Sequence, residues 1–137
     1  MQRTGCFGTC PSMYLEIDSM GNFFFEGKNF TEKEGLYSGI LSDDELKIIK
    51  SEINSIQLDK LSELYMARWT DDQTCGVSIK TKDKTYESSA YGFNNEPVEL
   101  RILFHKLMEL YKTIELKKDS NIIDKFKLNK FHNRLDS

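Results

Sequence analysis

The first forty residues alternate apolar and polar positions in short runs. Residues 13–17 place apolar side chains at every second position, which is the period of a half-buried strand. Turn-forming residues follow at 19–22, and residues 23–26 form a second run rich in β-forming aromatic side chains. These runs predict a β-hairpin. A third strand over residues 34–40 is a weaker prediction because two glycines interrupt it.

Two later segments have the three- and four-residue apolar spacing of amphipathic helices. The first begins at Ser42, whose hydroxyl can cap the helix while the side chain of Glu45 reaches back to it. The second begins near Pro97, which fits a first helical turn because its missing amide costs nothing there, and Lys117 and Lys118 suit its C-terminal end. The two apolar stripes consist of Leu46, Ile49, Ile53 and Ile56, and of Leu100, Leu103, Leu107 and Leu110.

Between these helices the pattern predicts a second hairpin. Residues 75–79 alternate as a strand and residues 85–91 return, while residues 58–65 are compatible with a short helical turn. Two hairpins and two one-sided helices bury all their apolar faces in one arrangement. The predicted fold is therefore an α+β two-layer sandwich, in the order β-β-(β)-α-β-β-α. Its antiparallel sheet has four to five strands, and both helices cover one face.

The length and charge limit the classes of function. With 137 residues the chain fits one domain, predicted over residues 1–115 and followed by a basic tail over residues 116–137 that is compatible with a short docking helix. The tail holds six basic and three acidic residues, so the net charge of −3 leaves −6 on the body. An acidic body disfavours binding to nucleic acid. No apolar run reaches the roughly 20 residues of a transmembrane helix.

No group of residues has the spacing of a catalytic, cofactor or metal site. Asp71 lies in a polar loop, where a solvated turn explains it better than a functional role does. His105 lies alone in a helix, and Cys75 alternates with apolar residues and is predicted to be in the core. A zinc site would need four ligands, and Cys75 with His105 or His132 shows no ligand spacing. We therefore expect no catalytic residue, metal or cofactor, and the prediction leans away from an enzyme.

The uncovered face of the sheet offers a candidate binding surface. Consecutive strand residues point to opposite faces, so Phe24 cannot share a face with Phe23 and Phe25. Phe24, joined by Tyr14 and Tyr86, is expected on the face without helices, where a protein or small ligand could bind. The other open explanation is that loops or a second copy cover these rings. Further binding candidates are Arg3 and Asp71.

Two cysteines, Cys6 and Cys10, are separated by three residues, of which the middle one is Gly8. Such a loop can bring two Cα atoms to the roughly 5–6 Å that a disulfide needs. Reduced thiols in a cytosolic protein remain an alternative. Redox catalysis or metal binding is a third, but it is disfavoured because a strand follows, and not the helix that lowers thiol pKa values.

The sequence Arg3-Thr4-Gly5-Cys6-Phe7-Gly8-Thr9-Cys10-Pro11, followed by a strand, resembles the DUF6438 family of uncharacterised bacterial domains. The resemblance continues through Gly39 and Tyr91-Gly92 to about residue 112. It implies a domain that often occurs in exported or lipid-anchored proteins, and hence an oxidised Cys6–Cys10 pair. It carries no established activity.

Together these observations favour a non-enzymatic, extracytoplasmic interaction or ligand-binding module. Its location would be periplasmic or at the cell surface after removal of an export segment, with the cytoplasm as the alternative. The rival hypotheses are an enzyme whose site forms only in three dimensions, with Arg3, Cys6, Cys10 and Asp71 as participants, and a cytosolic inhibitor or immunity-type protein.

Overall fold

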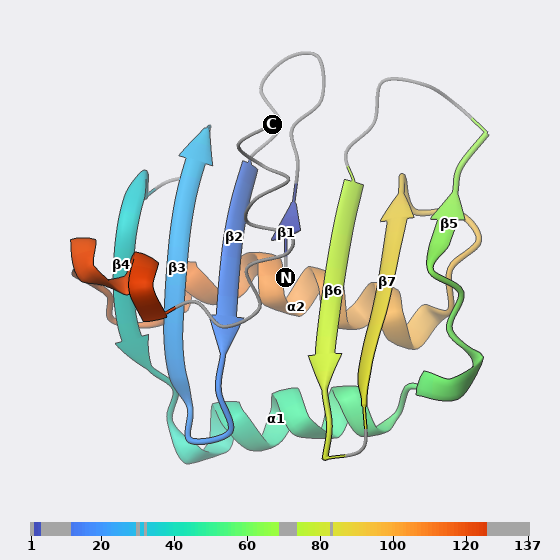
Figure 1. Ribbon diagram of the computed structural model, residues 1–137, viewed down its shortest axis with the longest axis horizontal. Coiled ribbons are helices and arrows are strands. Elements are labelled where there is room, and N and C mark those ends of the chain that lie inside the picture. The colour runs from blue at the N-terminus through green and yellow to red at the C-terminus, as the bar shows by residue number, and fades with distance from the viewer. Residues whose placement is uncertain are drawn as a thin grey trace.

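The computed structural model describes residues 2–3, 12–29, 31, 33–68, 74–82 and 84–125. It contains one mixed sheet and two α-helices, with two short 3-10 helices (Figure 1). The strands are β1 (Gln2–Arg3), β2 (Ser12–Ile17), β3 (Asn22–Asn29), β4 (Gly35–Ile40), β5 (Leu64–Met66), β6 (Thr74–Lys80), β7 (Thr85–Tyr91) and β8 (Lys117–Lys118). The helices are α1 (Asp43–Asn54), α2 (Val98–Thr113), η1 (Leu58–Lys60) and η2 (Ser120–Lys125).

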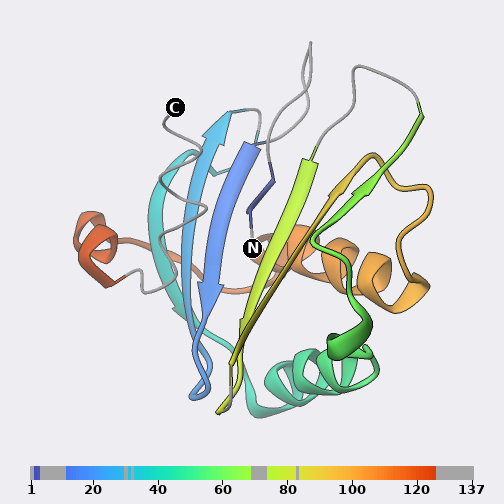
Figure 2. The same cartoon turned by 45° about the vertical axis from the view of Figure 1, so that its right-hand side comes forward.

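The strand order in the sheet is β5-β7-β6-β1-β2-β3-β4-β8. Two longer ladders, β2-β3-β4 and β6-β7, meet at β1, which is only two residues long and pairs antiparallel with both β2 and β6. Both α-helices lie on one face of this sheet (Figures 1 and 2). The α+β class, the element order and the one-sided helical layer are therefore confirmed.

Three short strands were not predicted. β5 follows the 3-10 turn η1 and pairs parallel with β7, so the sheet is mixed and not purely antiparallel. β8 consists of Lys117 and Lys118, which pair with Tyr37 and Ser38 of β4. These lysines were expected at the end of the second helix, but α2 ends at Thr113. Charged residues on a short edge strand are typical because they discourage pairing with other chains.

Helix α1 begins as its sequence predicts. The Ser42 hydroxyl accepts from the Glu45 amide at 3.1 Å, and the Glu45 carboxylate accepts from the Ser42 amide at 2.9 Å. Helix α2 depends on a different anchor, the carboxylate of Glu96, whose side chain is fully buried. This carboxylate accepts from the Asn94 amide at 2.9 Å and from Arg101 Nε at 2.6 Å, which fixes the first turn of the helix.

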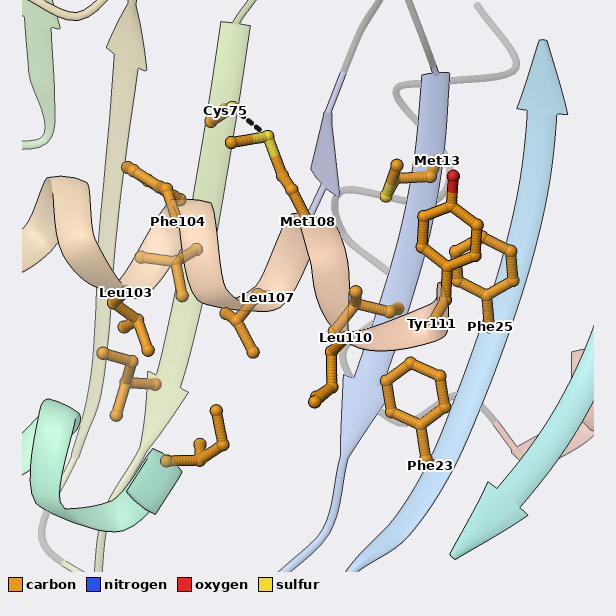
Figure 3. Close-up of a cluster of buried hydrophobic side chains, with 14 of the residues drawn as sticks. Met13, Phe23, Phe25, Cys75, Leu103, Phe104, Leu107, Met108, Leu110 and Tyr111 are labelled. Atoms are coloured by element: carbon orange, nitrogen blue, oxygen red, sulfur yellow. Dashed lines mark hydrogen bonds between the residues drawn. The ribbon is translucent and has the colours of Figure 1, made fainter. Parts of the chain in front are cut away.

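The main core lies between the sheet and the two helices. Helix α2 supplies a row of apolar side chains that point toward the strands (Figure 3). Cys75 is fully buried there, and its thiol lies 3.8 Å from the sulfur of Met108. Phe25 stacks on Tyr111 with ring centroids 4.6 Å apart. The prediction that Cys75 is a core residue is confirmed.

A second, smaller cluster lies on the opposite face of the sheet, which we call the open face. Ile122 of η2 is fully buried against Tyr14, with Phe24 and Leu36 packed around them. The Asp119 amide donates to the carbonyl of Leu36 at 2.9 Å and ties this segment to β4. Residues 116–122 therefore contact both the edge and the open face of the sheet. A domain boundary at residue 115 stays a prediction.

Candidate functional site

The sheet is incomplete between β2 and β6. Because β1 is so short, it separates these strands only at Met13–Tyr14 and Cys75–Gly76. Beyond those residues no described strand lies between them, and Figure 1 draws no strand between β2 and β6 below β1. A cavity of about 270 Å³ occupies this place. We call it the β2–β6 slot; its walls are residues 15–17 of β2 and residues 77–80 of β6.

The floor of the β2–β6 slot is apolar because the helical layer closes it. Five helix side chains line it: Leu46, Ile49 and Ile53 of α1, and Leu103 and Leu107 of α2. The mouth is polar and carries charges of both signs, from Glu16, Asp18, Lys50 and Lys80. An apolar floor with a few polar groups at the rim is the usual composition of a ligand pocket, although the volume is just below the usual range of roughly 300–1,000 Å³.

A buried polar pair lies beside the slot on the open face. The Tyr14 hydroxyl donates to a carboxylate oxygen of Glu16 at 2.6 Å, and both side chains are buried. Burial raises the pKa of Tyr14 well above its ordinary value, and the hydrogen bond to Glu16 and its negative charge raise it further. Each effect favours the neutral phenol, so Tyr14 stays protonated in the folded domain and can hold the Glu16 carboxylate in place.

This raised pKa predicts a loss of stability in alkali. The unfolded chain releases the Tyr14 proton near pH 10, whereas the folded domain retains it. Below pH 10 Tyr14 is protonated in both states, so its raised pKa does not change the free energy of unfolding. Above pH 10 the free energy of unfolding falls by up to about 1.4 kcal/mol per pH unit. We expect urea unfolding between pH 8 and pH 11 to show a steeper decline for the wild type than for Tyr14→Phe. The other tyrosines are common to both proteins, so equal declines would contradict this prediction.

The residues predicted for the open face have different outcomes. Tyr14 and Phe24 lie on it, as expected, and Ile122 partly covers them. Tyr86 does not. It pairs with Ile79, whose side chain belongs to the main core, and its hydroxyl donates to Asp59 of η1 at 3.0 Å. The prediction for Tyr86 is wrong because the hairpin register puts it on the helix-covered face.

The remaining site candidates are only partly described. Arg3 is placed by its backbone, which pairs with Met13 and Cys75. Cys6, Cys10 and Asp71 lie outside the described residues, and so does the predicted Cys6–Cys10 disulfide. The binding roles of Arg3, Asp71, Tyr14, Phe24 and Tyr86 stay predictions.

The described part of the chain holds no group of three or more side chains that could bind a metal ion. His105 is exposed on α2, where its ring contacts Phe93 at 5.0 Å between centroids. This position on the outer side of a helix is explained by packing at the surface.

Sequence reasoning missed the β2–β6 slot. The residues of its floor were predicted as the apolar stripes of two helices, and the residues of its walls as strands. Both predictions are correct for each element taken by itself. The slot exists because a two-residue strand separates two ladders that are distant in the sequence. No local pattern in the sequence predicts it, because β1 is only two residues long.

Comparison with known proteins identifies the family of this chain. The family described as Domain of unknown function (DUF6438) matches residues 1–111, which is most of the chain. The chain belongs to this family. No curated protein and no solved structure matches it. The DUF6438 match includes every wall and floor residue of the β2–β6 slot. No helix in the described ranges is both long and apolar enough to cross a membrane.

Proposed function

We propose that this DUF6438 domain is a non-enzymatic, extracytoplasmic binding module, and that the β2–β6 slot is its binding site. The observation that carries the proposal is the interruption of the sheet at the slot, where the helical layer supplies an apolar floor below a polar mouth. Between the two ladders, the partly exposed side chains of Leu46 and Ile53 line the cavity together with more deeply buried residues such as Leu103. Accessible apolar surface with polar groups at its rim favours binding of an apolar ligand.

The extracytoplasmic part of the proposal has separate support. Residues 3–11 resemble domains that often occur in exported or lipid-anchored proteins, and an oxidising compartment would favour a bond between Cys6 and Cys10. An acidic body and a polar mouth with charges of both signs are compatible with a protein or small-molecule ligand, and disfavour nucleic acid.

A blocking substitution tests the site. Ser78 lines the slot and points to the open face, because it alternates with the core residues Val77 and Ile79. We expect Ser78→Trp to obstruct the mouth with an indole ring. The probe is the fluorescent dye 8-anilinonaphthalene-1-sulfonate, which binds accessible apolar pockets. The dissociation constant of the dye should rise at least tenfold in this variant.

Ser89→Trp is the matched control. Ser89 is also a partly exposed serine on the open face, where it pairs with Gly76, but it does not line the slot. Dye affinity should be unchanged in Ser89→Trp, and equal urea midpoints would show that both variants fold. Equal dye binding by wild type and Ser78→Trp would overturn the proposal.

A further inference from the structure

The two ends of the sheet are protected to different degrees. Figure 1 shows β4 toward one end of the sheet and β5 at the other. Beyond β4, the edge strand consists of Lys117 and Lys118, which are both exposed, and charged side chains on an edge discourage pairing with another chain. At the other end, β5 consists of Leu64, Tyr65 and Met66 and carries no charged residue. The β5 edge therefore lacks the protection that the opposite edge has.

The main-chain groups of Leu64 and Met66 point away from the sheet. Along a strand, the N–H and C=O groups of successive residues alternate between its two sides. One side of β5 bonds to β7: the carbonyl of Glu63 accepts from a β7 amide at 2.9 Å, and the Ala67 amide donates to a β7 carbonyl at 2.8 Å. By this alternation the groups of Leu64 and Met66 are directed to the outer side, where no described strand pairs with them.

The side chains of the same two residues form an exposed apolar pair. Leu64 is 52% exposed and Met66 is 54% exposed. Tyr65, which lies between them, points to the opposite face and packs against the main core. Leu64 and Met66 therefore share the open face, beside their pairing partners Ser89 and Tyr91 of β7. Exposed apolar side chains next to unpaired main-chain groups are typical of a surface that pairs with another strand.

The β5 edge is complementary to itself. We consider a second copy placed antiparallel, with a two-fold axis between the two Tyr65 residues. Leu64 of each copy then lies opposite Met66 of the other copy. Residues directly opposite in such a ladder can exchange both main-chain bonds, so the outward groups of Leu64 and Met66 all gain partners. The apolar side chains of both copies then pack across the axis on the open face.

The charges that flank β5 favour the same arrangement. Glu63 precedes the strand, Arg68 follows it closely, and both side chains are exposed. Neither forms an ion pair with another residue in the described ranges. In the two-fold ladder, Glu63 of one copy lies opposite Ala67 of the other copy and hence one position from its Arg68. Opposite charges therefore meet at both ends of the ladder, which stabilises it, whereas like charges would destabilise it.

We propose that two copies of this chain associate through their β5 edges, in an antiparallel pairing about a two-fold axis that joins their sheets. Because β5 is only three residues long, the ladder is short and the interface is small. Interfaces that bury less than roughly 1,200 Å² are typical of weak, transient complexes. The dimer is therefore weak and forms only at high protein concentration. Its contact surface does not include the β2–β6 slot.

Sedimentation equilibrium of the full chain, at concentrations up to about 1 mM, tests the association. We expect a monomer–dimer equilibrium. Met66→Lys places a charge on the paired edge and should raise the dissociation constant at least tenfold. Met20→Lys is the matched control, because Met20 is an 81% exposed methionine in the turn between β2 and β3. This control should leave the dissociation constant unchanged, and equal urea midpoints would show that both variants fold.

Amide hydrogen exchange identifies the strand that pairs. As the protein is concentrated, exchange at Leu64 and Met66 should slow in proportion to the remaining fraction of monomer. Tyr65, whose main-chain groups face β7, is the internal control and should not change. Three outcomes would overturn the proposal: a chain that stays monomeric over the whole range, a dimer that Met66→Lys does not weaken, or a dimer in which exchange at Leu64 and Met66 is unchanged.

Discussion

Replacing Phe25 with alanine should lower the free energy of unfolding by about 3–5 kcal/mol, the range for removing a buried aromatic ring. Phe25 is fully buried, stacks on Tyr111 at 4.6 Å between centroids and lies 6.3 Å from the ring of Phe23. The loss combines the transfer of the ring from water with the cavity it leaves between sheet and helix α2. Urea unfolding followed by circular dichroism measures it.

Phe24→Ala is the matched control for this prediction. Phe24 is the adjacent residue in the same strand, but it lies on the open face, where it is only partly buried against the small cluster around Ile122. Phe24→Ala should lower the free energy of unfolding by less than half as much as Phe25→Ala, because less buried apolar area is removed and the surface can adjust. Equal losses would contradict the assignment of the two rings to different faces.

Replacing Ile122 with alanine should lower the free energy of unfolding by about 2–4 kcal/mol, because a fully buried isoleucine loses most of its contacts. This side chain of η2 is buried against Tyr14, Phe24 and Leu36. The same urea unfolding experiment measures the effect. A sizeable loss would show that the segment after α2 contributes to the stability of the fold.

Ile40→Ala provides the comparison for Ile122→Ala. Ile40 ends β4 and is 72% exposed, so the same chemical change should alter stability by no more than about 0.5 kcal/mol. If the two isoleucine variants lose the same small amount, the docking of Ile122 on the open face contributes nothing to the folded state.

Local signals in the sequence predicted those elements whose causes are local. The Ser42–Glu45 capping box identified the start of α1, and the spacing of leucines identified the buried face of α2. The turn residues after each first strand identified both hairpins. In each case the residues that form the structure are neighbours in the chain, and their pattern is therefore visible without a fold.

Features that depend on pairing between distant residues were either not predicted or predicted wrongly. The face of Tyr86 is decided by its pairing with Ile79, and the small side chains of Ser88 and Ala90 hid the apolar side of that strand. β5 shows no clear alternation because it is only three residues long, and its partner β7 lies later in the chain. The β2–β6 slot is the extreme case, since it depends on how far β1 extends between two ladders.

The arrangement of β1 has a consequence for the order of assembly. Gln2 is near the beginning of the chain, yet one of its two partners is Gly76. Closing so long a loop costs conformational entropy before the contact can stabilise anything. The β2–β3 and β6–β7 hairpins close over a few residues each and do not need β1. During synthesis β1 therefore leaves the ribosome well before its partner at residue 76, and the two halves of the sheet can be joined only when both are available.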